Sequence, residues 1–295
     1  MNWQEVIVTT DVLFKDVVAD ALRICDDCRG VSIEQPFSIE AQKTIENAPV
    51  KIRAYFPEGA LALNCVVKQL ELQEETLKGQ WQVSLQVVKD EDWEESWKKY
   101  FHPLRIGKKI VIKPTWENFI PGPDDVLIEL DPGMAFGTGD HATTRMCLEL
   151  LEEYIKDAKT VIDAGCGSGI LSLAAARLGA RKVLAFDNDE VAAKIAAENV
   201  QLNKLDEMIT VETGDIIKIL PNLNGDIVMA NIIAEVIEQL ITGASKALYP
   251  GGYLLVSGII GSKWPGIQRS LLETGFVIDR VAREGEWVAA AACRT

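Results

Sequence analysis

Short apolar runs alternate with amphipathic helical patterns over the second half of this 295-residue chain. The apolar runs lie at residues 161–163, 183–187, 209–211, 226–229 and 253–256. Between them, apolar residues recur at spacings of three and four, which is typical of helices. The alternation predicts parallel strands joined by helices, a doubly wound α/β sheet. Two more runs, at 276–281 and 287–292, have no long helix between them. They predict an antiparallel hairpin at the sheet edge, which makes seven strands.

The first ninety residues have a different order of elements. Apolar runs predict strands at 6–8, 30–34, 50–56 and 81–88, and helical stripes lie near 14–28 and 63–70. This order, βαββαβ, predicts a ferredoxin-like α+β sandwich. Such a fold carries no chemistry by itself, so we interpret it as a recognition or dimerisation module. The predicted domains are 1–90 and 125–295, with a linker or hinge at 91–124.

Composition limits the class of partner and the compartment. The chain has 44 acidic and 30 basic residues, a net charge of −14. Acidic proteins repel phosphate backbones, so no direct nucleic-acid contact is expected, and a basic protein or a cationic small substrate fits better. No apolar run reaches the ~20 residues of a membrane span, and the first residues do not resemble a signal peptide. We therefore expect a cytoplasmic protein without a membrane contact.

The pair Cys25-Asp-Asp-Cys28 has the spacing of a redox or zinc motif. It lies at the end of a helical stripe, whereas redox pairs lie at a helix start, where the dipole stabilises a thiolate. No second pair completes a zinc site. We predict two core-facing thiols and no metal.

A glycine-rich loop follows the first strand of the second half and opens a helix. It reads Asp163-Ala-Gly165-Cys-Gly167-Ser-Gly169, and the next strand ends at Asp187. Glycines let a ligand approach the backbone, and a carboxylate at Asp187 is placed to accept hydrogen bonds from a ribose. Position 170 is Ile, so the string is not the dinucleotide fingerprint. It resembles the S-adenosylmethionine loop of Rossmann-like methyltransferases, although a plain tight turn has the same residue types.

A polar amide, Asn231, follows the fourth strand directly. Because that strand lies beside the first, Asn231 is expected to face the transferable methyl group and to hold an attacking amine by hydrogen bonding. The alternative is that Asn231 caps the next helix. Adenine-specific methyltransferases have an aromatic residue three places later, where this chain has Ala234. A nucleobase flipped into this site would therefore have no aromatic side chain at position 234 to stack on.

The segment 131–144 contains three glycines and several hydroxyl side chains before a helix. We expect a polar loop that covers the cofactor. Thr143 or Thr144 has the chemistry of a helix cap, which is the structural alternative. His141 is interpreted as a hydrogen-bonding residue rather than a base.

Together, the string from Asp131 to Thr144, the glycine loop and the Ala230–Ala234 turn resemble the bacterial ribosomal protein L11 methyltransferase family, the PrmA type. The resemblance extends over nearly the whole chain. It implies a class I methyltransferase domain, S-adenosylmethionine as cofactor, and an N-terminal domain that recognises the ribosomal protein. It also implies methylation of lysine ε-amines and the N-terminal α-amine of L11, free or during ribosome assembly. The cofactor contacts that it implies are Thr144, Gly165, Asp187 and Asn231, with Phe136 nearby.

Three alternatives remain beside this one. The first is a methyltransferase that acts on another protein or on a small amine, the second a nicotinamide-dependent oxidoreductase, and the third a binding module without catalysis. Ile170 argues against the second, and the intact loop with Asp187 and Asn231 argues against the third. We expect a monomer, because no interface pattern stands out.

Overall fold

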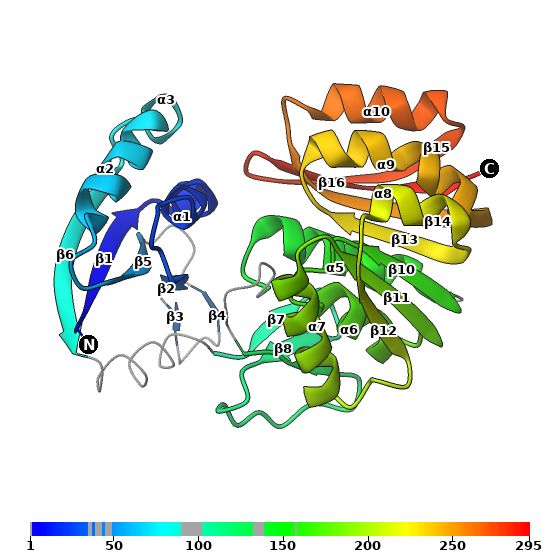
Figure 1. Cartoon of the computed structure of the whole chain (residues 1–295), viewed down its shortest axis with the longest axis horizontal. Coiled ribbons are helices and arrows are strands. Elements are labelled where there is room, and N and C mark those ends of the chain that lie inside the picture. Colours follow the sequence, from blue (N-terminus) through cyan, green and yellow to red (C-terminus); the bar gives the residue numbers. More distant parts are fainter. Residues whose placement is uncertain are drawn as a thin grey trace. The chain divides into compact units, whose positions relative to one another are not determined.

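The structure is a computed structural model that describes residues 2–34, 37–38, 43–44, 49–89, 102–131, 139–156 and 158–295 (Figure 1). The chain divides into two compact units, Met1–His102 and Pro103–Thr295. Each unit has its own hydrophobic core, so each is described by itself.

The N-terminal unit is a four-stranded antiparallel sheet with the strand order β2-β5-β1-β6. This order of a βαββαβ chain is the ferredoxin-like arrangement that the sequence predicts. Its elements are β1 (Asn2–Thr10), η1 (Val12–Phe14), α1 (Lys15–Arg23), β2 (Gly30–Glu34), β3 (Phe37–Ser38), β4 (Lys43–Thr44), β5 (Val50–Pro57), α2 (Ala62–Leu72), α3 (Glu74–Leu77) and β6 (Trp81–Lys89).

The helices α1 and α2 pack against one face of this sheet. Alternate strand residues such as Val8 and Ile52 are fully buried there together with Leu22 of α1 and Leu70 of α2. Cys25 lies in the same core, and Cys28 packs against it. The prediction of core-facing thiols is confirmed for this pair.

The second unit contains a seven-stranded sheet with the order β12-β11-β10-β13-β14-β16-β15. The first five strands in this order are parallel, and β16 pairs antiparallel with β14 and β15. The doubly wound sheet and its edge hairpin are therefore as predicted. The elements are β10 (Thr160–Ala164), α6 (Ile170–Arg177), β11 (Lys182–Asp187), α7 (Glu190–Leu202), β12 (Ile209–Thr213), α8 (Ile216–Ile219), η3 (Leu220–Asn222), β13 (Gly225–Asn231), α9 (Ala234–Ala247), β14 (Leu248–Ile260), α10 (Trp264–Glu273), β15 (Phe276–Glu284) and β16 (Trp287–Arg294).

Helices cover both faces of this sheet (Figure 1). A further helix, α5 (Ala142–Tyr154), packs with α6 and α7 on one face, and α9 and α10 cover the other. Neighbouring strand residues alternate between the two cores, as Val161 and Ile162 do in β10. Burial on both faces explains why the strands read as continuous apolar runs.

Residues 103–124 differ from the predicted linker, because they belong to the second unit. They contain β7 (Leu104–Ile106) and β8 (Ile110–Lys113), which form a small sheet with β9 (Val126–Glu129). Ile110 and Ile112 are buried beside Ile128 in the core of that unit. The apolar side chains of β8 therefore keep this segment packed, and the part of the predicted linker at 91–101 lies outside the described residues.

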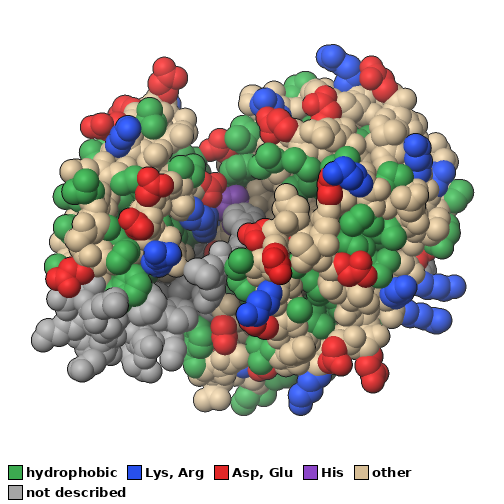
Figure 2. All heavy atoms as spheres, viewed as in Figure 1, with side chains coloured by type: hydrophobic (Ala, Val, Ile, Leu, Met, Phe, Trp, Pro, Cys, Tyr) green, Lys and Arg blue, Asp and Glu red, His purple; other side chains and the backbone are tan. Residues whose placement is uncertain are grey.

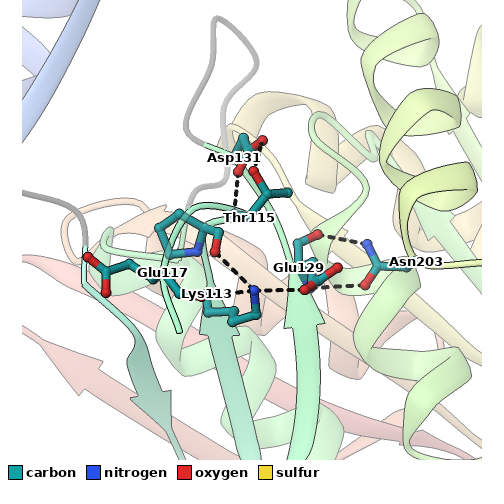
Figure 3. Close-up of polar contacts among 7 residues, drawn as sticks. Lys113, Thr115, Glu117, Glu129, Asp131 and Asn203 are labelled. Atoms are coloured by element: carbon teal, nitrogen blue, oxygen red, sulfur yellow. Dashed lines mark hydrogen bonds and ion pairs between the residues drawn. The ribbon is translucent and has the colours of Figure 1, made fainter. Parts of the chain in front are cut away.

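Lys113 is a buried cation at the end of β8, 7% exposed (Figure 3). Its Nζ lies 2.7 Å from Glu129 Oε1 on β9 and donates to the carbonyls of Pro114 and Glu117 at 3.2 Å each. These partners compensate for the loss of hydration that a buried ammonium group suffers.

Asn203, at the C-terminal end of α7, binds the other side of β9 (Figure 3). Its Oδ1 accepts the Glu129 N–H at 3.0 Å, and its Nδ2 donates to the Glu129 carbonyl at 2.7 Å. The same Nδ2 donates to the Asn199 carbonyl at 2.9 Å. The Asn203 carboxamide therefore forms the two hydrogen bonds that a neighbouring strand would otherwise make to the N–H and carbonyl of Glu129.

We expect Asn203→Ala to destabilise the fold. The side chain is 3% exposed, and its loss leaves the N–H and the carbonyl of Glu129 without their partner. The expected loss is about 1–3 kcal/mol in the free energy of unfolding, measured by urea denaturation. Asn224→Ala, at an exposed position, is the matched control and should change stability by less than about 0.5 kcal/mol. Equal stability of the two variants would contradict the prediction.

Within the described part of the chain, no helix combines the length and apolar character that crossing a membrane requires. Figure 2 shows acidic and basic side chains interspersed on one face of each unit. All six cysteines are free thiols.

Candidate active site

The predicted site residues meet where the parallel strands of the large sheet end. The glycine loop follows β10, Asp187 ends β11 and Asn231 ends β13. β10 lies between β11 and β13 in the sheet. The chain therefore reverses its winding direction at β10, and open α/β sheets bind ligands at such a point.

Gly165 opens the loop with φ +82°, a left-handed conformation that glycine adopts without strain. Its N–H donates to the Phe186 carbonyl on β11 at 2.8 Å. A Cβ atom at this position would lie 2.5 Å from Cγ2 of Ile232, the residue after Asn231. A side chain at this position would collide with the Asn231 turn, because the glycine loop and that turn are in van der Waals contact here.

The carboxylate of Asp187 is oriented by two backbone groups. Oδ2 accepts the Gly167 N–H at 2.8 Å, and Oδ1 accepts the Asp189 N–H at 3.0 Å. The side chain is partly exposed. Each carboxylate oxygen has more than one acceptor site, so these bonds fix its direction and leave capacity for a ligand hydroxyl.

Asp163, near the end of β10, is fully buried. Ser172 Oγ donates to its Oδ2 at 2.6 Å, and its Oδ1 has no partner among the described residues. Burial raises the pKa of the Asp163 carboxyl to about 7, the Ser172 hydrogen bond opposes the rise, and the charge of Asp187 adds to it. Asp163 is therefore a buried acid that is partly protonated near neutral pH.

Asp163→Asn should reduce the pH dependence of stability. The folded pKa of about 7 is above the ordinary 3.8, so between these values the folded protein holds a proton that the unfolded chain has released. The contribution of Asp163 to the free energy of unfolding consequently falls as pH rises from 3.8 to 7, by up to ~1.4 kcal/mol per pH unit. The stability of the variant relative to wild type should therefore rise between pH 3.8 and 7 and stay constant above pH 7. Thermal melts from pH 4 to 8 measure this, and parallel curves would disprove the assignment.

Asn231 points its carboxamide toward the start of α5. Its Nδ2 donates to Thr144 Oγ1 at 3.2 Å, and Thr144 is fully buried. Its Oδ1 is buried and has no partner among the described residues. The alternative of a helix cap does not hold, because the N-cap of α9 is Ile233. The bond to Thr144 holds the amide so that an acceptor oxygen remains available.

The cap of α5 is His141, not Thr143 or Thr144. His141 Nδ1 accepts the Thr143 N–H at 3.3 Å and lies 2.7 Å from its hydroxyl oxygen. The ring packs edge-on against Trp287 of β16, with centroids 5.2 Å apart. His141 therefore has the hydrogen-bonding role predicted for it, and Thr144 is left available for Asn231.

The glycine-rich segment before α5 is described only at its ends. Thr115 donates its N–H and hydroxyl to the Asp131 carboxylate at 2.6 and 2.8 Å (Figure 3). At the other end, a Cβ on Gly139 would lie 2.7 Å from Ile112 Cδ1 of β8. The predicted cofactor contact Phe136 lies outside the described residues.

Three residues near Asn231 were not anticipated from the sequence: Ile232, Ser257 and Gly258. Ser257 pairs with Asn231 across β13 and β14, and it is fully buried. The available signal was a Ser-Gly pair at the end of the apolar run 253–256, in the strand beside Asn231.

A family model described as ribosomal protein L11 methyltransferase (PrmA) matches residues 2–295. The chain belongs to this family. A curated member from Syntrophomonas wolfei is 42% identical, with 99% of each chain covered, and one from Listeria monocytogenes is 39% identical, with 98% covered. Both are named ribosomal protein L11 methyltransferase.

A solved structure supports the fold of the family. The crystal structure of a ribosomal protein L11 methylase from Lactobacillus delbrueckii subsp. bulgaricus matches with a TM-score of 0.59 and 32% identity. The match covers 66% of this chain and 99% of that chain.

The residues at the carboxyl ends of β10, β11 and β13 fit S-adenosylmethionine, the cofactor of this class of methyltransferase. Gly165 keeps the backbone free of a side chain that would collide with the Asn231 turn. The carboxylate of Asp187 is fixed at the end of β11, and Asn231 has a buried acceptor without a partner among the described residues.

Proposed function

We propose that this protein transfers methyl groups from S-adenosylmethionine to amines of ribosomal protein L11, namely lysine ε-amines and the N-terminal α-amine. Membership of the family supports the reaction and the protein substrate. The observation that supports an amine as the methyl acceptor is the buried Oδ1 of Asn231, which needs a hydrogen-bond donor such as an amine N–H. We also propose that the enzyme acts as a monomer in the cytoplasm, on L11 free of the ribosome or during its assembly.

When bound, S-adenosylmethionine supplies a methyl group on a positively charged sulfur atom. Asp187 would bind the ribose hydroxyls through its carboxylate, and Gly165 and Gly167 would let the backbone approach the methionine moiety. The hydrogen bond from Ser172 to Asp163 joins α6 to β10, the two elements that this loop connects. The family resemblance also implies cofactor contacts at Thr144, beside Asn231, and at Phe136.

Asn231 positions the substrate amine. Its Oδ1 would accept an N–H of the amine and direct the nitrogen lone pair toward the methyl group, because a reactive arrangement needs the nitrogen and the methyl carbon ~3–3.5 Å apart. A lysine amine has an ordinary pKa of ~10.4 and must lose a proton, which passes to water, before it attacks. Removal of water from the cleft lowers that pKa by disfavouring the ammonium form. Desolvation and alignment thus replace a strong base in this proposal.

The N-terminal unit is proposed to recognise L11. Its ferredoxin-like fold carries no cofactor site in this scheme, and a small amine would not need such a unit. The net charge of −14 favours approach of a basic protein by electrostatic steering.

The test is a transfer assay with methyl-labelled S-adenosylmethionine and free L11, read by intact mass. Mass gains in steps of one methylene support the proposal, and L11 with chemically acetylated amines is the control that should gain nothing. Transfer to small amines or other proteins but not to L11 would overturn the substrate. The absence of both transfer and cofactor binding by calorimetry would overturn the reaction.

A further inference from the structure

The bulge formed by Ser257 and Gly258 in β14 lies beside the Asn231 turn. β14 pairs with β16 through Val256↔Ala290 and Ile259↔Val288, so two residues of β14 face one residue of β16 between these pairs. Bulges of this kind re-aim the backbone and are frequent next to active sites.

Gly258 contacts the peptide after Asn231 directly. Its φ is +84°, and a Cβ at this position would lie 2.3 Å from the carbonyl oxygen of Ile232 and 3.1 Å from its nitrogen. No other residue type fits so close to this backbone without a shift. The same Ile232 fills the space above Gly165 of the cofactor loop. The bulge therefore limits where the Asn231 turn can lie relative to that loop.

Ser257 connects the bulge to the two segments that orient the carboxamide. Its hydroxyl donates to the Thr143 carbonyl at 2.8 Å, and its own carbonyl accepts the Ile232 N–H at 3.2 Å. Thr143 precedes Thr144, the acceptor of Asn231 Nδ2. One buried serine thus fixes both the residue after Asn231 and the residue before its partner.

We propose that Ser257 and Gly258 are positioning residues for methyl transfer, which act by fixing the orientation of the Asn231 carboxamide. The proposal rests on the proposed function of Asn231 as the acceptor of the substrate amine. Neither residue touches the reacting atoms in this scheme. Loss of the Ser257 hydroxyl lets the start of α5 shift relative to the turn, and Thr144 then no longer holds Asn231 in one orientation.

Ser257→Ala should lower kcat for L11 by about 10–100-fold, the loss expected from a displacement of about 1 Å in a reacting group. The KM for L11 should stay within about twofold, and the Kd for S-adenosylmethionine should change much less than kcat. Ser257→Thr keeps the hydroxyl and should restore most of the rate. Thr274→Val is the matched control, because the Thr274 hydroxyl also donates to a carbonyl, that of Ser270, at 2.7 Å in α10.

A double-mutant cycle separates positioning from a general structural role. If Ser257 acts through Asn231, Ser257→Ala should cause no further loss in an Asn231→Ala background, whereas independent effects multiply. The side-chain amide signal of Asn231, assigned by its absence in Asn231→Ala, gives a readout without activity. Its proton exchange should accelerate in Ser257→Ala and not in Thr274→Val.

Multiplicative effects in the cycle, or an unchanged Asn231 amide signal in Ser257→Ala, would overturn this inference. A wild-type protein that methylates no amine would instead overturn the proposed function. The wild-type assay therefore distinguishes the two failures.

Discussion

Asn231→Ala is expected to reduce kcat for methyl transfer by about 100–1000-fold, the range seen when one preorganised polar group is removed from an active site. In the proposed function the buried Oδ1 accepts a hydrogen bond from the substrate amine, and alanine would leave the amine nitrogen without a fixed direction. Cofactor affinity should fall much less, because Gly165 and Asp187 remain. Single-turnover rates with bound cofactor measure the chemical step directly.

Two controls make this result specific to the site. Asn224→Ala removes an exposed carboxamide from the same unit and should retain the wild-type rate. A thermal melt of Asn231→Ala shows whether a slow variant is still folded. A folded Asn231→Ala variant with wild-type kcat would remove Asn231 from the mechanism.

Asp187→Ala should weaken the binding of S-adenosylmethionine by roughly 10–100-fold. This range corresponds to ~1.5–3 kcal/mol, the value of hydrogen bonds to a charged group. The variant also loses the acceptor that holds the Gly167 N–H, so the loop is less well fixed. Isothermal titration calorimetry with the cofactor gives the affinity.

Asp189→Ala is the matched control for Asp187→Ala. Its carboxylate caps α7 by accepting the Val191 N–H at 2.8 Å, so the change should cost ~1 kcal/mol of stability. It should leave the cofactor affinity within about twofold. If both variants bind the cofactor equally well, Asp187 is not a cofactor ligand.

The features predicted correctly from the sequence are those that depend on local pattern. Continuous apolar runs and a glycine string between a strand and a helix are visible within about thirty residues. Strand order at the winding reversal then follows from general rules for α/β sheets, so the positions of Asp187 and Asn231 relative to the glycine loop were predictable. Their roles in binding and catalysis stay predictions.

The features that were missed depend on contacts between distant segments. β8 was placed in a linker, because its burial depends on β9 and on the core under α5 and α6. The role of His141 as the cap of α5 depends on its ring packing against Trp287 near the end of the chain. The hydrogen bond from Ser257 to Thr143 was not predictable from local pattern, because the two residues are 114 positions apart in the sequence.

The carboxamide of Asn203 has a consequence for the behaviour of the protein in concentrated solution. β9 is the outer strand of its small sheet, and Val126 and Leu130 use their N–H groups toward β8. The backbone N–H and carbonyl of Glu129 therefore point away from β8. Unpaired backbone groups on an outer strand are a template with which a strand of another chain can pair. Asn203 occupies both backbone groups of Glu129 and ends that edge with a side chain. It protects the sheet from intermolecular pairing at the position where it also joins β9 to α7.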